Sequence, residues 1–209
     1  MNELFDILLK KPLSDVLLHS LLFVAFMLHI LFVLLTLGTA IIALYYFIHA
    51  WWGERLNEVR WDKEILRTFL AHKSLAVVLG VAPLLLIQIG STVPFFTGLN
   101  LFTPFWLMII PFLIMAFLSF DALGHRIYVH HYLHLIIGVI ALITLLAVPG
   151  IFVAVLVTSE NSGCWTTIIG HGYKLGNPLA YHWLFRYLHV LGAAIVFRRC
   201  FSLFLLYKR

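Results

Sequence analysis

The sequence predicts an all-α integral membrane protein, a single membrane domain built as a bundle of five transmembrane helices. Of its 209 residues, 63% are hydrophobic and 11% are charged, and the mean hydropathy is +1.02. Soluble domains are about 45–50% apolar and about a quarter charged. Long apolar runs satisfy their backbone hydrogen bonds inside a bilayer by forming helices. The composition therefore argues against a soluble domain.

The first predicted span covers residues 13–49. It is longer than the roughly 20 residues that cross a bilayer, so we expect it to tilt or to project beyond the membrane. Ser14 and Asp15 are typical of a helix start. Glu3 and Asp6 stand where a signal peptide would be basic, which predicts a membrane span and not a cleaved signal.

Four further apolar runs complete the predicted bundle, at residues 73–96, 101–120, 132–157 and 178–200. Pro83 is expected to bend the second span, and Pro111 lies at the middle of the third. The fifth span contains RYLHVLGAAIVF, residues 186–197, in which a single histidine stands in an apolar run.

The positive charges predict that the N-terminus is outside and the C-terminus is cytoplasmic. Cytoplasmic ends of membrane helices carry an excess of Lys and Arg. One side of the predicted bundle carries Arg55, Arg60, Lys63, Arg67, Lys73, Arg126, Arg198, Arg199, Lys208 and Arg209, and the other carries Lys10, Lys11, Lys174 and Arg186. The net charge of +5 thus reflects orientation, and we expect no nucleic-acid partner.

Histidine is the unusual residue of this sequence, with eleven histidines against nine acidic residues. Ionisable residues inside a membrane are functional candidates by default. His29 and His189 are the deepest and can share an outer depth, while His72 and His134 can share an inner one. We expect interfacial or loop positions for the others, which are His19, His49, His125, His130, His131, His171 and His182. Of these, His49 is a further candidate for the inner depth.

Single histidines at matched depths on separate helices predict axial ligands of b-type haem. Gly192 follows His189 by three residues and Gly138 follows His134 by four, so each glycine shares its histidine's helix face and could leave room for a flat ring. Small residues serve helix packing equally well. A methionine, from among Met27, Met108 and Met115, also stays open as a ligand.

Three segments carry a family resemblance. The segment LHILFVLLTLGTAI (28–41) resembles the first-helix signature of cytochrome bd quinol oxidase subunit I, whose haem-ligating histidine falls on His29. The segment NPLAYHWLFRYLHVLGAAI (177–195) resembles the later helix whose histidine binds the low-spin haem b, here His189. The segment HKSLAVVLGVAPLLLIQ (72–88) resembles small bd-like membrane cytochromes that work with multihaem c-type cytochromes.

This resemblance implies a haem b cytochrome of the bacterial inner membrane, with two haems, that transfers electrons between the quinone pool and a redox partner. The partner would be a c-type cytochrome or another redox subunit, and a homo-oligomer stays open. The oxidases carry glutamates inside the membrane, whereas Glu3, Glu54, Glu58, Glu64 and Glu160 all lie outside the predicted spans. We therefore expect an electron-transfer subunit and not an oxygen reductase.

Quinone oxidation releases protons, so it also needs a titratable group near an inner or outer haem. Asp121 with His125 and Arg126 is the inner candidate, and Arg186 with His182 is the outer one, although each set also suits interface anchoring. The alternative function is a haem-free metal or proton-coupled transporter or an assembly factor, in which histidines relay protons or bind a transition metal. Such metal sites usually add carboxylates or thiolates, which these spans lack except near their edges.

Overall fold

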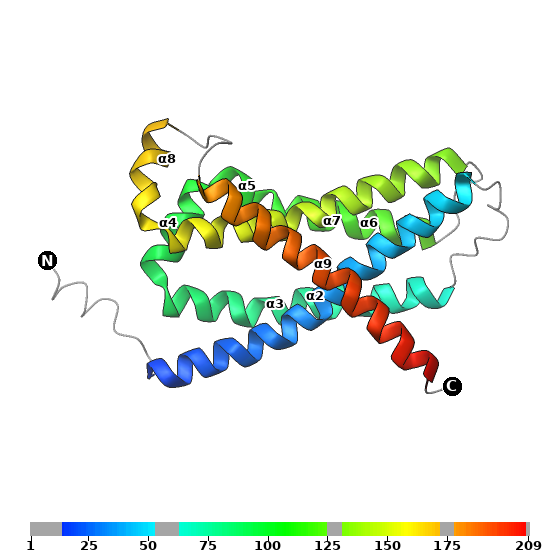
Figure 1. The fold of residues 1–209 in the computed structure, drawn as a ribbon, viewed down its shortest axis with the longest axis horizontal. Coiled ribbons are helices and arrows are strands. Elements are labelled where there is room, and N and C mark those ends of the chain that lie inside the picture. The colour runs from blue at the N-terminus through cyan, green and yellow to red at the C-terminus, as the bar shows by residue number, and fades with distance from the viewer. Residues whose placement is uncertain (1–13, 53–62, 125–130, 172–177, 208–209) are drawn as a thin grey trace, which may run out of the picture.

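The computed structural model describes residues 14–52, 63–124, 131–171 and 178–207, of which 97% are helical (Figure 1). The helices are α2 (Asp15–Trp52), α3 (Lys63–Gly90), α4 (Thr92–Leu101), α5 (Thr103–Leu107), α6 (Ile109–Gly124), α7 (His131–Glu160), the 3₁₀ turn η1 (Ser162–Cys164), α8 (Trp165–His171) and α9 (Pro178–Tyr207). The all-α prediction is confirmed for these residues.

Four helical segments are long and apolar enough to cross a membrane: Asp15–Tyr45, His72–Gly90, Thr103–Leu123 and Leu135–Glu160. They correspond to the first four predicted spans, and they fit a multi-pass membrane protein. Among the residues that the structure describes, α9 is not one of the four.

Some predicted boundaries were wrong. Residues 63–72, expected as a loop, are the first turns of α3, since no proline or glycine interrupts KEILRTFLAH. The helix α3 then ends at Gly90 instead of residue 96, because Ser91 adopts φ −132° and ψ 48°. Pro111 lies in the first turn of α6 and not mid-helix. It has no N–H to give Leu107, and the helix breaks just before it, at Met108.

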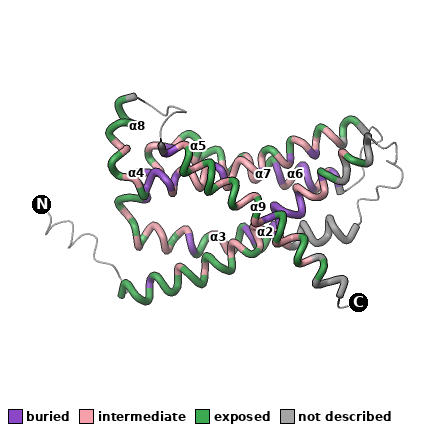
Figure 2. The backbone as a smooth tube through the Cα atoms, in the orientation of Figure 1, coloured by how far each residue is buried: buried purple, intermediate pink, exposed green. Residues whose placement is uncertain are grey.

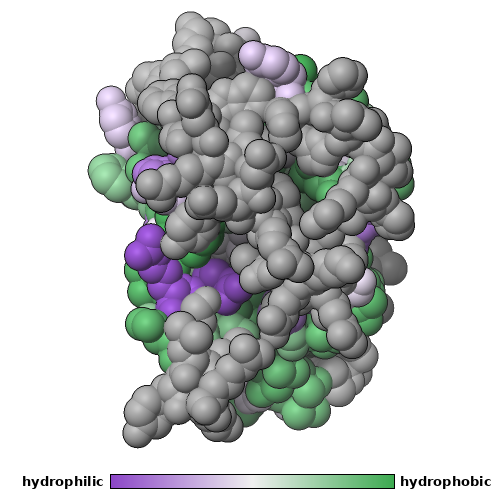
Figure 3. Space-filling view, turned by 90° about the vertical axis from the view of Figure 1, so that its right-hand side faces the viewer, coloured by the Kyte–Doolittle hydropathy of each residue, from purple (hydrophilic) through white to green (hydrophobic). Residues whose placement is uncertain are grey.

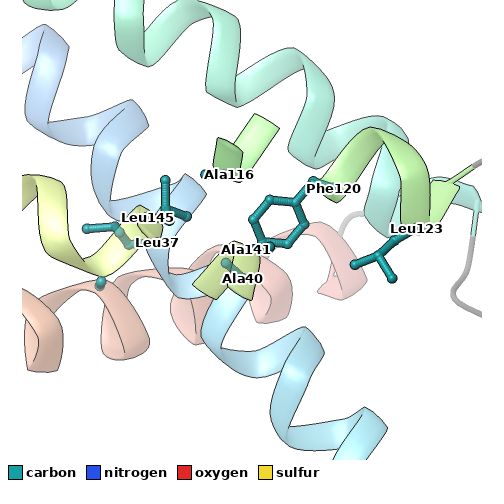
Figure 4. Packing of buried hydrophobic residues seen from close by; sticks show 8 residues of the cluster. Leu37, Ala40, Ala116, Phe120, Leu123, Ala141 and Leu145 are labelled. Carbon is teal, nitrogen blue, oxygen red and sulfur yellow. The ribbon is translucent and has the colours of Figure 1, made fainter. Parts of the chain in front are cut away.

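The helices pack around one main apolar core. Figure 4 shows Leu37 and Ala40 of α2 against Ala116 and Phe120 of α6. The other members of this cluster are Leu123, Ala141, Leu145 and Ala194. Burial is concentrated where these helices meet, and the helix faces and ends away from this core are mostly exposed (Figure 2).

Viewed from the right-hand side of Figure 1, the described surface is mainly hydrophobic, with hydrophilic residues gathered in a patch (Figure 3). Exposed apolar side chains suit helices surrounded by lipid.

Two sets of hydrogen bonds hold α9 to the bundle. Near its start, Trp183 Nε1 donates to the Gly150 carbonyl at 2.8 Å and the Tyr187 hydroxyl donates to the Leu146 carbonyl at 2.9 Å. The two aromatic rings stack with their centroids 5.5 Å apart. Further along, Arg198 Nε donates to Thr39 Oγ1 at 2.8 Å. The first half of α9 is therefore fixed to α7 and its second half to α2.

The helices α2 and α9 cross in close contact at Gly38. A Cβ built on Gly38 would collide with the Ala194 carbonyl oxygen and would lie 2.7 Å from Arg198 Cβ. We expect Gly38→Ala to cost about 2 kcal/mol of unfolding free energy, because overpacking against a backbone forces two helices apart. Thermal unfolding in detergent measures this loss. Gly192→Ala is the control, since a Cβ there meets nothing within 4 Å, and equal melting of both variants would contradict the prediction.

Candidate functional site

The His29 imidazole of α2 is half-buried and reaches across to α3. Its Nδ1 lies 2.8 Å from the Ala76 carbonyl oxygen. A carbonyl only accepts hydrogen bonds, so Nδ1 carries the ring proton and Nε2 carries the lone pair. Metal-ligating histidines typically donate their other ring N–H in this way, which fixes the tautomer and the ring orientation. His29 therefore presents the protonation state that a metal ligand needs.

An apolar groove continues the contact between α2 and α3. Its volume is about 280 Å³, and it is lined by Leu21, Val24, Ala25, Leu28, Leu79, Ala82 and Leu86. Ala25 in this lining precedes His29 by four residues on α2, and Leu79 follows Ala76, the acceptor for His29, by three residues on α3, so each shares a helix face with the contact. The imidazole thus stands beside an apolar recess between the same two helices.

His72 lies on the same seam of α2 and α3. Its ring lies between Phe32 at 6.0 Å and Phe201 at 6.2 Å, measured between centroids. Its Nδ1 is buried and has no hydrogen-bond partner among the described residues. Ala76, one turn after His72, is the acceptor for His29. The structure therefore brings His29 and His72 to one helix contact, a pairing that the sequence did not predict.

His189 lies on an exposed face of α9. Nothing lies within 4 Å of a Cβ built on Gly192, so the predicted open space beside His189 exists. In the described part of the chain, no hydrogen bond or ring contact joins His189 to His29. The helices α2 and α9 meet at Gly38 and Ala194, and their N-terminal arms diverge from that crossing (Figure 1). Ligation by this pair stays a prediction.

His134 lies in the first turn of α7, and the structure does not describe its side chain. Its predicted partnership with His72 therefore stays a prediction. A Cβ on Gly138 would lie 3.4 Å from Leu44 Cδ1 and 3.9 Å from Leu123 Cδ1. Aliphatic side chains fill the space beside Gly138, so this glycine serves helix packing.

The predicted titratable groups have specific partners. Asp121 Oδ1 accepts from Lys73 Nζ at 2.7 Å, and Lys73 Nζ lies 5.1 Å from the centroid of the Phe117 ring. Arg186 pairs with Glu160 at 2.7 Å. His182, proposed beside Arg186, is exposed, and His125 and Arg126 lie outside the described residues.

Sequence reasoning missed Lys73, Ala76 and Gly80. Lys73 was counted only as a cytoplasmic charge, yet it is buried and ion-paired. The spacing of His72, Ala76 and Gly80 places one face of α3 toward α2 and could have found Ala76 and Gly80. Lys73, which pairs with Asp121 of α6, is not part of that spacing.

Within the described ranges, no group of three or more His, Cys, Asp or Glu side chains could hold a metal ion. Haem iron takes only its axial ligands from the protein, so this finding bears on a bare metal site and not on haem. Met27 and Met115 are exposed on their helices, and Met108 is exposed at the break between α5 and α6.

Comparisons with known protein families, curated proteins and solved structures find no match to this chain.

Proposed function

We propose that this protein is a membrane-bound haem b cytochrome that transfers electrons between the quinone pool and a redox partner. The observation that carries the proposal is the 2.8 Å hydrogen bond from His29 Nδ1 to the Ala76 carbonyl. This bond leaves Nε2 unprotonated and able to bind iron, and a neighbouring helix holds the ring in one orientation.

The surroundings of His29 suit a haem. Cofactor sites are concave and mostly apolar, with volumes of about 300–1,000 Å³. The groove beside His29, at about 280 Å³, lies just below that range, and only apolar side chains line it. When bound, haem supplies reversible one-electron transfer at its iron. The chain's own part is to hold the axial imidazole and to exclude water with leucine, valine and alanine side chains.

The remaining predicted ligands belong to the same proposal. His189 would hold a haem on the open face of α9, and His72 with His134 would serve an inner haem. The enclosed Nδ1 of His72 lacks the acceptor that His29 has. Of the two half-buried histidines on the seam, His29 thus fits the ligand role better.

We further propose that α9 is a fifth span, with the N-terminus outside and the C-terminus in the cytoplasm of a bacterium. Its 30 residues are long enough to cross a bilayer. The buried Lys73 and the Arg198–Arg199 pair lie toward the inner side in this orientation, as cytoplasmic cations do. The redox partner is proposed to be a c-type cytochrome or another redox subunit.

A visible spectrum of the purified protein tests the function. We expect the reduced-minus-oxidised difference to show the α-band of b-type haem, because the proposed cofactor is a protoporphyrin held only by axial ligands from the protein. Haem extraction, set against protein concentration, then counts the haems per chain. A protein purified from cells supplied with haem that shows no such band would overturn the proposal and leave the haem-free transporter or assembly factor.

A further inference from the structure

Gly80 stands where the His29 ring meets α3. A Cβ built on Gly80 would lie 2.8 Å from His29 Cε1, 3.1 Å from Nδ1 and 3.5 Å from Nε2. Carbon atoms that are not bonded to each other prefer separations of about 3.5–4.0 Å. A side chain at position 80 and the His29 imidazole therefore compete for one space.

The same glycine leaves the Ala76 carbonyl open to α2. Within α3 this carbonyl faces the N–H of Gly80, four residues later. A helical side chain leans back over the turn that precedes its own Cα, so a side chain at position 80 would cover the Ala76 oxygen. A carbonyl has two lone pairs, and the absence of a side chain leaves the second one accessible to His29 Nδ1, 2.8 Å away.

We infer that Gly80 is the positioning residue for His29. It exposes the Ala76 carbonyl, and the carbonyl then holds the imidazole with its proton on Nδ1 and its lone pair on Nε2. This assignment of the tautomer stands on geometry alone. The use of Nε2 as a haem ligand rests on the proposed function.

Ordinary helix packing does not account for Gly80. At Gly138 an added Cβ would meet Leu44 and Leu123, two aliphatic side chains. At Gly80 each of the three nearest atoms belongs to the imidazole ring, and that ring is hydrogen-bonded to the preceding turn of the same helix. The space left by the missing side chain at Gly80 is therefore occupied by the His29 imidazole, in the orientation that its hydrogen bond fixes.

The first test uses haem-free protein in bilayers, labelled with ¹⁵N-histidine. Solid-state NMR reports which ring nitrogen carries the proton, and the His29→Gln variant identifies the His29 signal. We expect a protonated Nδ1 in the wild type and loss of that form in Gly80→Ala. Gly150→Ala is the matched control, since a Cβ there meets Tyr187 at an ordinary 3.5 Å. An unchanged His29 tautomer in Gly80→Ala would overturn the inference.

The second test measures haem binding by the same variants. We expect Gly80→Ala to weaken haem affinity by about 10- to 100-fold, as loss of an orienting partner does, and Gly150→Ala to match the wild type. Wild-type affinity in Gly80→Ala would count against the positioning role. The two proposals can fail separately. If the wild type binds no haem, but the Nδ1-protonated form of His29 is present in the wild type and lost in Gly80→Ala, the proposed function is refuted and the positioning of the ring is supported.

A folding defect in Gly80→Ala is covered by the double variant with His29→Ala. The small side chain at position 29 removes the collision, so we expect the double variant to melt at a higher temperature than Gly80→Ala alone. A double variant as unstable as Gly80→Ala would show that the collision is not with His29, and would overturn the inference.

Discussion

Replacing His29 with alanine is expected to remove the haem that this residue ligates. The substitution deletes the nitrogen that the Ala76 carbonyl orients. Loss of an orienting partner alone costs about 10- to 100-fold in metal affinity, and loss of the ligand itself is expected to cost at least as much. Haem content per chain, from the pyridine haemochrome of purified protein, measures the effect.

His19→Ala is the matched control for this substitution. The Nδ1 of His19 also lies against a carbonyl, that of Asp15 at 2.6 Å, but this bond lies within the first turn of α2 and the ring is exposed. We expect unchanged haem content in this control. His189→Ala, measured in parallel, reports whether α9 holds a haem of its own. Full haem content in His29→Ala would contradict the role of His29 as a ligand.

Replacing Asp121 with alanine is expected to destabilise the fold by about 3 kcal/mol, because it leaves a buried ammonium without its carboxylate. The Lys73 side chain is 11% exposed and pairs with Asp121 at 2.7 Å, whereas the Asp121 side chain is 42% exposed. This partial exposure places the expected loss at the low end of the range for buried ion pairs. Chemical unfolding in detergent, followed by circular dichroism, measures the loss.

The double variant Lys73→Met with Asp121→Leu separates loss of the pair from loss of helix packing. It removes both charges and keeps most of the side-chain volume, a replacement that is often neutral or stabilising. We expect it to recover most of the stability that Asp121→Ala loses. The idea that the pair joins α3 to α6 electrostatically fails if the double variant is as unstable as Asp121→Ala.

Helix content and the first four membrane segments could be predicted from the sequence, since apolar runs of this length have few other structures open to them. The boundaries were harder, because they depend on single backbone positions. The backbone dihedrals of Ser91 are not helical, so α3 ends there. The helix break that accompanies Pro111 falls three residues earlier, at Met108. Neither effect is visible in hydropathy, which averages over a window longer than the break.

The candidate site could be predicted only in part. Depth along each helix identified His29 and His72 as deep or edge histidines, but depth does not say which face a side chain occupies. The rotation of α2 and α3 about their axes places both rings on one seam, and that rotation depends on where small residues such as Gly80 allow close approach. His189 faces outward for the converse reason, since Trp183 and Tyr187 fix α9 to α7 by another face.

The attachment of α9 has a consequence for the order in which the bundle is assembled during synthesis. Its hydrogen-bond acceptors, Thr39 on α2 and the carbonyls of Leu146 and Gly150 on α7, leave the ribosome before α9 does. The helix α9 therefore docks onto two helices that have already been synthesised. Until α9 docks, α2 and α7 lack the hydrogen bonds through which this helix joins them.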